Sequence, residues 1–181
     1  MAPYSLDFDT LIQAKVEAFN RNGWSDESLP NEASLLKDKI QTVPTTITSL
    51  AEGLLTNTQQ IHLVWSELTT YIETGGADIT SYNIQWDAGQ YGLIWQHLVG
   101  YEADMLGTEY TVTQSILPSF EYSFQIRAQN KWGWSEWSEV ITVKASTWPE
   151  IISEPTTAIS LDDGNVVVSW VQPDERGSPI Y

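Results

Sequence analysis

One short pattern occurs twice in this chain, and its repetition constrains the fold more than any other feature. The second copy is an alternating apolar run at 124–130, an Asn/Gly turn, and then Trp-Ser-Glu-Trp-Ser at 134–138. The first copy, at 15–25, is weaker, and its Trp24 precedes Trp134 by 110 residues. An alternating run is typical of a strand that buries one face. Two copies of the closing strands of one domain predict a tandem array.

A second pair of landmarks recurs out of phase with the first. Trp65 and Trp170 end similar apolar runs and lie 105 residues apart. Two phase-shifted landmarks with nearly the same period predict three successive modules. The expected boundaries are 1–43 for the closing part of one module, 44–148 for a complete module, and 149–181 for the opening part of the next. Because two or three isolated strands are marginal in water, we expect the end segments to be disordered, to lean on the middle module, or to pair between chains.

The middle segment carries about seven short runs with strand periodicity, separated by turn residues. Their spacing predicts an all-β fold, a seven-stranded antiparallel sandwich of the immunoglobulin type, flanked by partial copies. Tyr122, Phe124 and Ile126 alternate and are expected to face inward together. His62 alternates with apolar neighbours and is expected to face solvent. Residues 31–40 have the propensity of a short helix, whereas the repeat favours a closing strand there.

The chain resembles tandem fibronectin type III repeats over nearly its whole length, and segment 134–138 resembles the Trp-Ser-x-Trp-Ser segment of cytokine receptors. The amino-acid sequence at 73–89 and 130–135 is also similar to repeats in very large surface proteins of ciliated protists. The resemblance implies a non-catalytic structural or adhesive module in a large cell-surface or extracellular chain, with an intracellular, titin-like use left open. A cytokine-receptor-like ligand-binding ectodomain and an accessory carbohydrate-binding or spacer module stay open as alternatives.

The resemblance also implies a structural brace. In these families the tryptophan rings of the Trp-Ser-x-Trp-Ser segment interleave with cationic side chains of the penultimate strand, whose outward positions here include one arginine. We therefore expect a short stack in which this arginine lies on a tryptophan ring. A tyrosine two positions before the core phenylalanine of that strand is where a tyrosine corner belongs. The expected brace residues are Arg127, Trp134, Ser135, Trp137, Ser138 and Tyr122.

Three aromatic residues outside the brace are candidates for a ligand surface. Trp132 lies in the turn between the last two expected strands, and Trp95 and Tyr91 lie near the fourth expected strand. If exposed on one face, these rings would form a platform for sugar or protein. The alternative is that Trp95 and Trp132 shield the two ends of the sandwich.

Charge narrows the range of partners. The chain has 24 acidic and 8 basic residues, a net charge of −16, and no run of lysines and arginines. Both nucleic acid and anionic membranes require clustered cations, so neither is expected as a partner. No apolar run approaches the ~20 residues of a membrane span, so direct membrane insertion is not expected either. The expected partners are other protein modules, chiefly neighbouring repeats, with carbohydrate as the alternative.

No arrangement of residues points to catalysis or to a cofactor. The chain has no cysteine, which excludes disulfides and thiolate metal sites and leaves the redox compartment open. His62 and His97 are the only histidines, and neither has an acidic residue at ligand spacing. Asp-Asp-Gly-Asn at 162–165 fits a hairpin turn better than a calcium loop, whose final glutamate is missing. We therefore expect no catalytic residue, no metal ligand and no cofactor.

Overall fold

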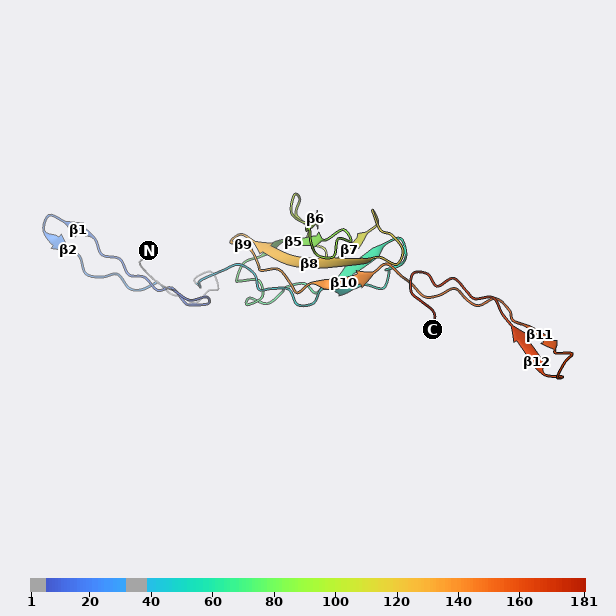
Figure 1. Cartoon of the computed structure of the whole chain (residues 1–181). Helices are drawn as coiled ribbons and strands as arrows, with labels where there is room; N and C mark the ends of the chain where they lie inside the picture. Colours follow the sequence, from blue (N-terminus) through green and yellow to red (C-terminus); the bar gives the residue numbers. More distant parts are fainter. Residues whose placement is uncertain (1–5, 32–38) are drawn as a thin grey trace.

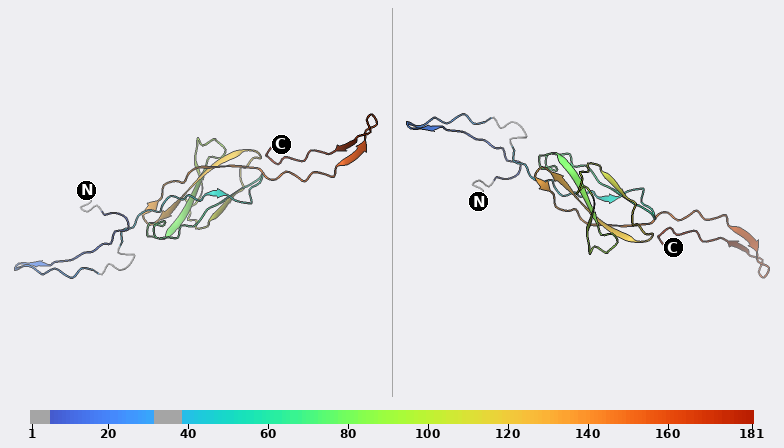
Figure 2. Two further views of the ribbon diagram at one scale, coloured as in Figure 1. Left: turned by 90° about the horizontal axis from the view of Figure 1, so that it is seen from below. Right: turned by 90° about the horizontal axis from the view of Figure 1, so that it is seen from above.

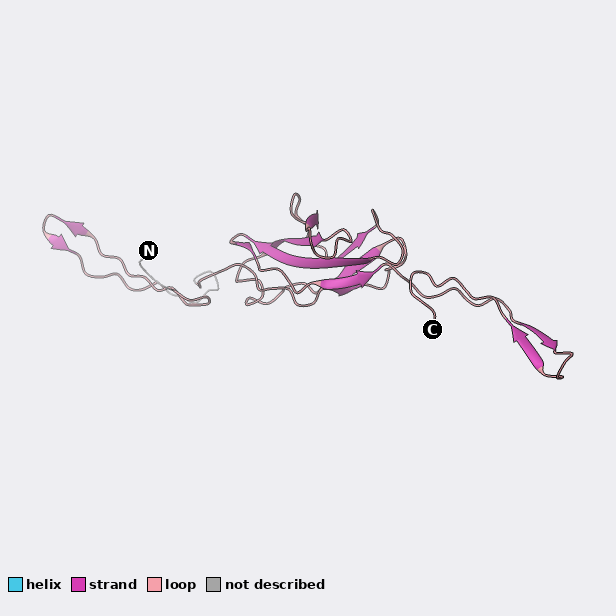
Figure 3. Cartoon of the chain, viewed as in Figure 1, coloured by secondary structure: helices cyan, strands magenta, loops and turns pink. Residues whose placement is uncertain are grey.

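The computed structural model describes residues 6–31 and 39–181, and in these residues strands and loops account for the whole fold, without a helix (Figure 3). A two-sheet sandwich occupies the centre, and one extended hairpin leaves it at each end, in opposite directions (Figures 1 and 2). The alternatives of strand and helix for 31–40 fall largely outside the described residues.

The central sandwich has one sheet of three strands and one of five, and every strand pairing is antiparallel. The smaller sheet has the order β3 (Ala51–Glu52), β4 (Ile61–Val64) and β7 (Glu109–Val112). The larger sheet has the order β10 (Ile141–Lys144), β8 (Glu121–Asn130), β5 (Ile79–Trp86) and β6 (Gln96–Val99), and the short β9 (Gly133–Trp134) also pairs with β8. This arrangement confirms the expected all-β, antiparallel sandwich.

The long ladder between β5 and β8 defines the two ends of the sandwich. Its register runs from Ile79 opposite Asn130 to Trp86 opposite Phe124. We call the first end, with loop 71–76 and turn 130–133, the entry pole. We call the other end, with loops 87–95 and 117–120, the exit pole. The chain enters the sandwich at the entry pole and leaves it after β10 at the exit pole (Figure 1).

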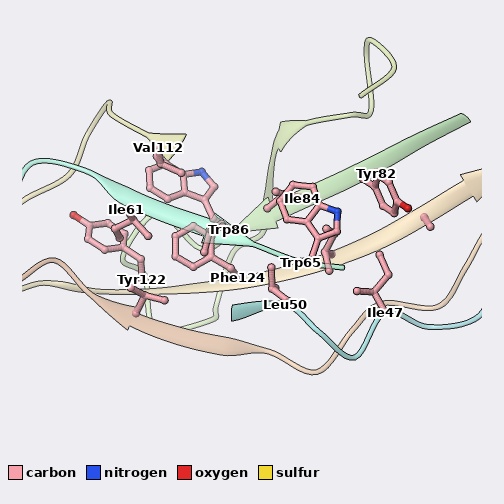
Figure 4. Packing of buried hydrophobic residues seen from close by; sticks show 14 of the residues in the cluster. Ile47, Leu50, Ile61, Trp65, Tyr82, Ile84, Trp86, Val112, Tyr122 and Phe124 are labelled. Carbon is pink, nitrogen blue, oxygen red and sulfur yellow. The ribbon is translucent and has the colours of Figure 1, made fainter. Parts of the chain in front are cut away.

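The core lies between the two sheets, and alternate residues of β8 form its floor. Tyr122, Phe124 and Ile126 are each at most 1% exposed, as their two-residue spacing predicted. The Trp86 ring stacks on Tyr122 at 5.6 Å and on Phe124 at 6.3 Å between centroids (Figure 4). Burying a side chain of this size stabilises the fold by about 1.5–3 kcal/mol. The module from about residue 44 to 145 therefore has a core of its own.

The prediction that His62 faces solvent is wrong, because the residue is only 6% exposed. His62 does point away from the core residues Ile61 and Leu63, but the segment after β3 folds over this outer face. Gly53 lies so close to the imidazole that a Cβ there would overlap the ring. His62 Nε2 also lies 3.2 Å from a carboxylate oxygen of Glu109. Alternation gave the correct face, but it carries no information about what covers that face.

Both terminal hairpins expose their side chains. Trp24 is 68% exposed in the head hairpin, and Ile159 is 70% exposed in the tail hairpin. The expected Asp-Gly turn at 162–165 joins the two tail strands. The strands are β1 (Phe19–Asn20) and β2 (Gly23–Trp24) in the head, and β11 (Thr156–Ile159) and β12 (Val166–Ser169) in the tail.

Candidate functional site

Two serines of the 134–138 segment continue the pairing with β8 beyond β9. Ser135 N donates to the Ala128 carbonyl at 2.8 Å, and Ser135 Oγ accepts from Ala128 N at 3.1 Å. Ser138 repeats this pair of bonds with Ile126, at 2.8 and 3.0 Å. Each hydroxyl also donates to the carbonyl of the residue that follows it, at 2.9 and 2.8 Å. Serine hydroxyls therefore replace the backbone acceptors that a regular partner strand would supply.

Arg127 points away from the core and lies between two tryptophan rings. Its Cζ is 4.5 Å from the centroid of Trp134 and 4.3 Å from that of Trp137. Its Nε donates to Asn83 Oδ1 at 3.2 Å, from the position directly opposite in the β5–β8 register. Each cation–π contact contributes about 0.5–2 kcal/mol. Burial lowers the pKa of Arg127, but a guanidinium stays charged at neutral pH.

Two further rings extend this stack beyond the length expected from the sequence. Tyr101 stacks on Trp134 at 6.4 Å between centroids, and His97 stacks on Tyr101 at 4.0 Å, nearly parallel. His97 Nδ1 lies 3.1 Å from the same Asn83 Oδ1 that receives Arg127. Burial, and then the nearby Arg127 charge, lower the pKa of His97. We call Trp137, Arg127, Trp134, Tyr101 and His97 the aromatic stack.

Sequence reasoning missed three of the residues around Arg127. The Asn83 position could have been found, because cross-strand neighbours on one sheet face interact and the β5–β8 pairing puts it opposite Arg127. His97 is on β6, and Tyr101 follows that strand in a loop. No periodicity relates these two residues to the 134–138 segment. Only the fold brings them beside Trp134.

The Tyr122 hydroxyl ties the loop before β8 to the core. It accepts a hydrogen bond from Leu117 N at 2.8 Å and donates to the Ser115 carbonyl at 3.2 Å. Ser115 itself has a left-handed φ of 60°. Because the ring is buried while the hydroxyl reaches the backbone, one side chain both fills the core and fixes the loop.

The three candidate ligand residues do not form one surface. Trp132 lies at the entry pole, whereas Tyr91 and Trp95 belong to the loop at the exit pole. Tyr91 is 86% exposed and Trp132 56%, while Trp95 is half-buried. The Trp132 indole donates to Gln41 Oε1 at 3.1 Å, so this ring lies against the segment that enters the module. A shared aromatic platform is therefore not formed.

The chemistry of the site is that of packing and hydrogen bonding. Across residues 6–31 and 39–181, no three His, Asp or Glu side chains are grouped so as to hold a metal ion. In the same ranges no helix is long and apolar enough to cross a membrane. Arg127 and His97 of the aromatic stack bond to Asn83 of β5, and the two serines bond to β8. The arrangement can fix the 134–138 segment on the outer face of the larger sheet.

Relatives at low identity are found among known proteins. The chain is 25% identical over 123 residues to protein turtle homolog B of Rattus norvegicus, and 26% identical over 123 residues to its counterpart of Homo sapiens. These matches cover 56% of this chain but only 9% of each relative. The chain therefore spans about a tenth of the length of these relatives.

Solved structures and a family model were also matched. Domains A168–A170 of titin align over 70% of this chain and 38% of their own, with 24% identity and a TM-score of 0.48. Chicken CNTN1 domains FN1–FN3 align over 87% of this chain and 52% of their own, with 14% identity and a TM-score of 0.47. The model of the fibronectin type III domain matches residues 54–144, which is half of the chain and most of the sandwich. The chain belongs to the fibronectin type III family.

Proposed function

We propose that this chain supplies a non-catalytic structural and adhesive module, residues 44–148, to a tandem array of fibronectin type III modules in a large cell-surface or extracellular protein. The observation that carries the proposal is the path of the chain. It enters the sandwich at one pole, leaves at the opposite pole, and continues beyond both into a hairpin (Figure 2). A module with this path lies in series with its neighbours, so force on the chain passes through it.

The head hairpin supports the array. Ser25 N donates to the Ala18 carbonyl at 2.8 Å, and Ser25 Oγ accepts from Ala18 N at 3.0 Å. Ser28 forms the same two bonds with Val16, at 2.9 and 3.0 Å. These four residues precede Ser135, Ser138 and their β8 partners by 110 positions. The repeated serine bonds favour an origin of residues 6–31 in a module of the same kind.

In this function the aromatic stack, its two serines and Tyr122 act as a brace. They fix the closing segment and the loop before β8 to the sheet that carries the chain out of the module. Neighbouring modules are the partners that this arrangement favours. No observation favours the cytokine-receptor alternative. The separation of Trp132 from Tyr91 and Trp95 weighs against a carbohydrate platform.

Single-molecule stretching of the full chain from its two ends tests the proposal. An autonomous module of about 105 residues should give one unfolding step that releases on the order of 350 Å of contour length, at about 3.3–3.6 Å per residue. The folded length of the module is subtracted from this figure. A step that releases all 181 residues, or extension without any discrete step, would contradict the proposal. As a control, Phe124→Ala should lower the force of the step without changing the length released.

A further inference from the structure

We infer that neighbouring modules are held in a fixed orientation by a joint that is repeated along the chain. The exit pole of one module forms the upstream half of each joint, and the entry pole of the next module forms the downstream half. This inference rests on the proposed array. The first joint lies around residues 40–45, at the entry pole. The second lies around 145–150, beyond the exit pole. The two joints share their backbone hydrogen bonds and their unusual backbone angles, position by position.

The first half of each joint attaches the linker to the loop of the upstream module. Ser119 N donates to the Ala145 carbonyl at 2.9 Å, and Ala145 N donates back to the residue after Ser119 at 2.9 Å. At the other joint, Asp9 N donates to the Ile40 carbonyl at 3.1 Å, and Ile40 N donates back to the residue after Asp9 at 3.0 Å. Both loop residues are left-handed although neither is glycine, with φ of 65° at Asp9 and 69° at Ser119. Such an unfavourable angle at the same place in both loops indicates that the geometry of the joint is repeated within the chain.

The second half attaches the linker to the loop of the downstream module. At the entry pole, Thr42 N donates to the Gly75 carbonyl and Thr45 N to the Glu73 carbonyl, both at 2.9 Å. Gly75 and Gly76 are left-handed, with φ of 67° and 78°. A Cβ on Gly75 would overlap the carbonyl oxygens of the linker, so this close approach requires glycine.

The tail of the chain repeats these bonds at the second joint. Thr147 N donates to the Arg176 carbonyl and Glu150 N to the Asp174 carbonyl, both at 3.1 Å. Arg176 and Gly177 are left-handed, with φ of 45° and 90°, in the places of the two glycines of the first joint. The linker positions are shifted by 105 residues from those of the first joint.

The two halves leave almost no slack in the linker. Ile40 is bonded to the upstream loop and Thr42 to the downstream loop, so only Gln41 lies between the two attachments. At the second joint only Ser146 lies between Ala145 and Thr147. A single intervening residue has two soft backbone dihedrals. The orientation of one module on the next is therefore nearly fixed, and fixed in the same way at both joints.

Asn130 closes the first joint from the downstream side. Its Nδ2 donates to the Thr42 carbonyl at 2.7 Å and to the Thr74 carbonyl at 2.8 Å, and the side chain is 2% exposed. Its Oδ1 accepts from Trp132 N at 2.8 Å. Asn20, 110 residues earlier, makes the same turn bond to Asn22 N at 2.8 Å, and within the described residues its Nδ2 has no bond. Asn20 is thus a natural control for the linker bonds of Asn130.

The side chains around the two joints differ. At the first joint Phe8 stacks on Tyr71 at 5.8 Å, and Lys39 Nζ lies 5.4 Å from the centre of the Tyr71 ring. Each joint also has an ion pair: Lys39 with Asp9 at 2.6 Å in the first, and Arg176 with Glu150 at 2.7 Å in the second, where it joins the linker to the downstream loop. Exposed ion pairs are screened by salt, whereas stacked rings are not. Salt should therefore weaken an ion pair at both joints, and the second joint, which lacks the Phe8–Tyr71 stack, should be the more sensitive to ionic strength.

Backbone order parameters of the full chain, measured by nitrogen-15 relaxation, test the inference. A fixed joint predicts order parameters of ~0.85 at Gln41 and Ser146, as in a rigid core, whereas a flexible linker would give values under ~0.6. Gly75→Ala should bring Gln41 below ~0.6, because the added Cβ displaces the linker. Gly92→Ala is the matched control, since Gly92 is also left-handed, with φ of 73°, but a Cβ there meets nothing within 4 Å.

Asn130→Ala should also lower the order parameter of Gln41, whereas Asn20→Ala should leave it unchanged. In 1 M salt, where the Debye length is about 3 Å, the value at Ser146 should fall more than that at Gln41. Amide exchange of Ile126 reports whether a variant has unfolded the core. If a variant has unfolded the core, the order parameters of Gln41 and Ser146 in the unaltered chain test the inference instead. Flexible values there, beside a rigid core, would overturn the joint while leaving the single unfolding step of the array in place.

Discussion

The head hairpin and the closing strands of the central module contain the same pattern in two environments. Both hold their serines by the same hydrogen bonds to the preceding strand. The head copy is exposed, whereas the central copy is packed on a sandwich. At equivalent positions the head copy has Ile12, Ala14, Glu17 and Glu27 where the central copy has Tyr122, Phe124, Arg127 and Trp137.

This difference separates two functions of the pattern. In the head, an ion pair between Lys15 and Glu27 at 2.7 Å and a ring contact between Phe19 and Trp24 at 4.8 Å take the place of the aromatic stack. The serine bonds persist without the stack and without a core. They therefore define the path of the backbone. We expect the core residues and the stack to supply stability, and these residues differ between the two copies.

The largest expected effect comes from writing the head residue into the core of the central copy. Phe124→Ala removes a ring that is fully buried and that stacks on Trp86. We expect the free energy of unfolding to fall by about 3–5 kcal/mol, measured by chemical denaturation. Val140→Ala, at a position that is 49% exposed, is the control and should change it by less than about 1 kcal/mol. Equal losses in the two variants would mean that the sandwich is not packed as described.

Arg127→Glu writes the head residue into the stack. It removes the cation–π contacts with Trp134 and Trp137, of about 0.5–2 kcal/mol each, and a longer one with Tyr101 at 5.9 Å, so we expect a loss of about 1–4 kcal/mol in the free energy of unfolding. The near-ultraviolet circular dichroism of the tryptophans should change with it. Arg127→Lys should retain part of the stability, because the charge remains while the planar stacking is lost. A glutamate variant as stable as the natural chain would show that the stack contributes nothing.

A serine substitution tests the shared hydrogen bonds. Ser138→Ala leaves the buried Ile126 N–H without its acceptor, and we expect a cost of about 1–3 kcal/mol. Ser28→Ala removes the equivalent bond in the exposed head, where water replaces the hydroxyl, and the free energy of unfolding should change by less than about 0.5 kcal/mol. If both substitutions cost the same, burial would not distinguish the two copies.

The smallest effect is expected in the titration of His97. Burial and Arg127 place its pKa below the usual value of 6.5, so protonation is disfavoured in the folded state. The unfolded chain then binds the proton more readily than the folded chain. The free energy of unfolding should therefore be highest above pH 6.5 and should decline as the pH falls below that value. Arg127→Gln should raise the pKa of His97, as followed by proton NMR of the ring. An unchanged pKa of His97 would contradict the placement of His97 beside Arg127 in the stack.

The strands were predictable because their signal is local. The two-residue alternation of Tyr122, Phe124 and Ile126 records burial directly in the sequence, and the core follows it. Features that depend on strand register, or on which segment covers a sheet face, were not predictable. His62 is buried by a segment that folds over it, and Trp132 and Tyr91 prove to lie at opposite poles only once β5 and β8 are aligned.

The stack residues that sequence analysis did not find, and the joints, were unpredictable for a different reason. Tyr101 and His97 join the stack from a loop and an edge strand whose positions the sequence pattern does not specify. The joints consist mainly of backbone hydrogen bonds, which leave little trace in residue identity. Two adjacent glycines, as in loop 71–76, are typical of a turn, but the close approach of Gly75 to Thr42 depends on where the linker runs.

Amide hydrogen exchange of the full chain, read by segment at two protein concentrations, is the most direct test of an autonomous module placed between pieces of its neighbours. Strong protection should be confined to about residues 44–148 and should not depend on concentration. The hairpin strands at 19–24 and 156–169 should exchange quickly. Protection of both hairpins that rises with concentration would mean that chains complete one another's modules. Strong protection of both hairpins at low concentration would contradict the division of the chain into one whole module and two partial ones.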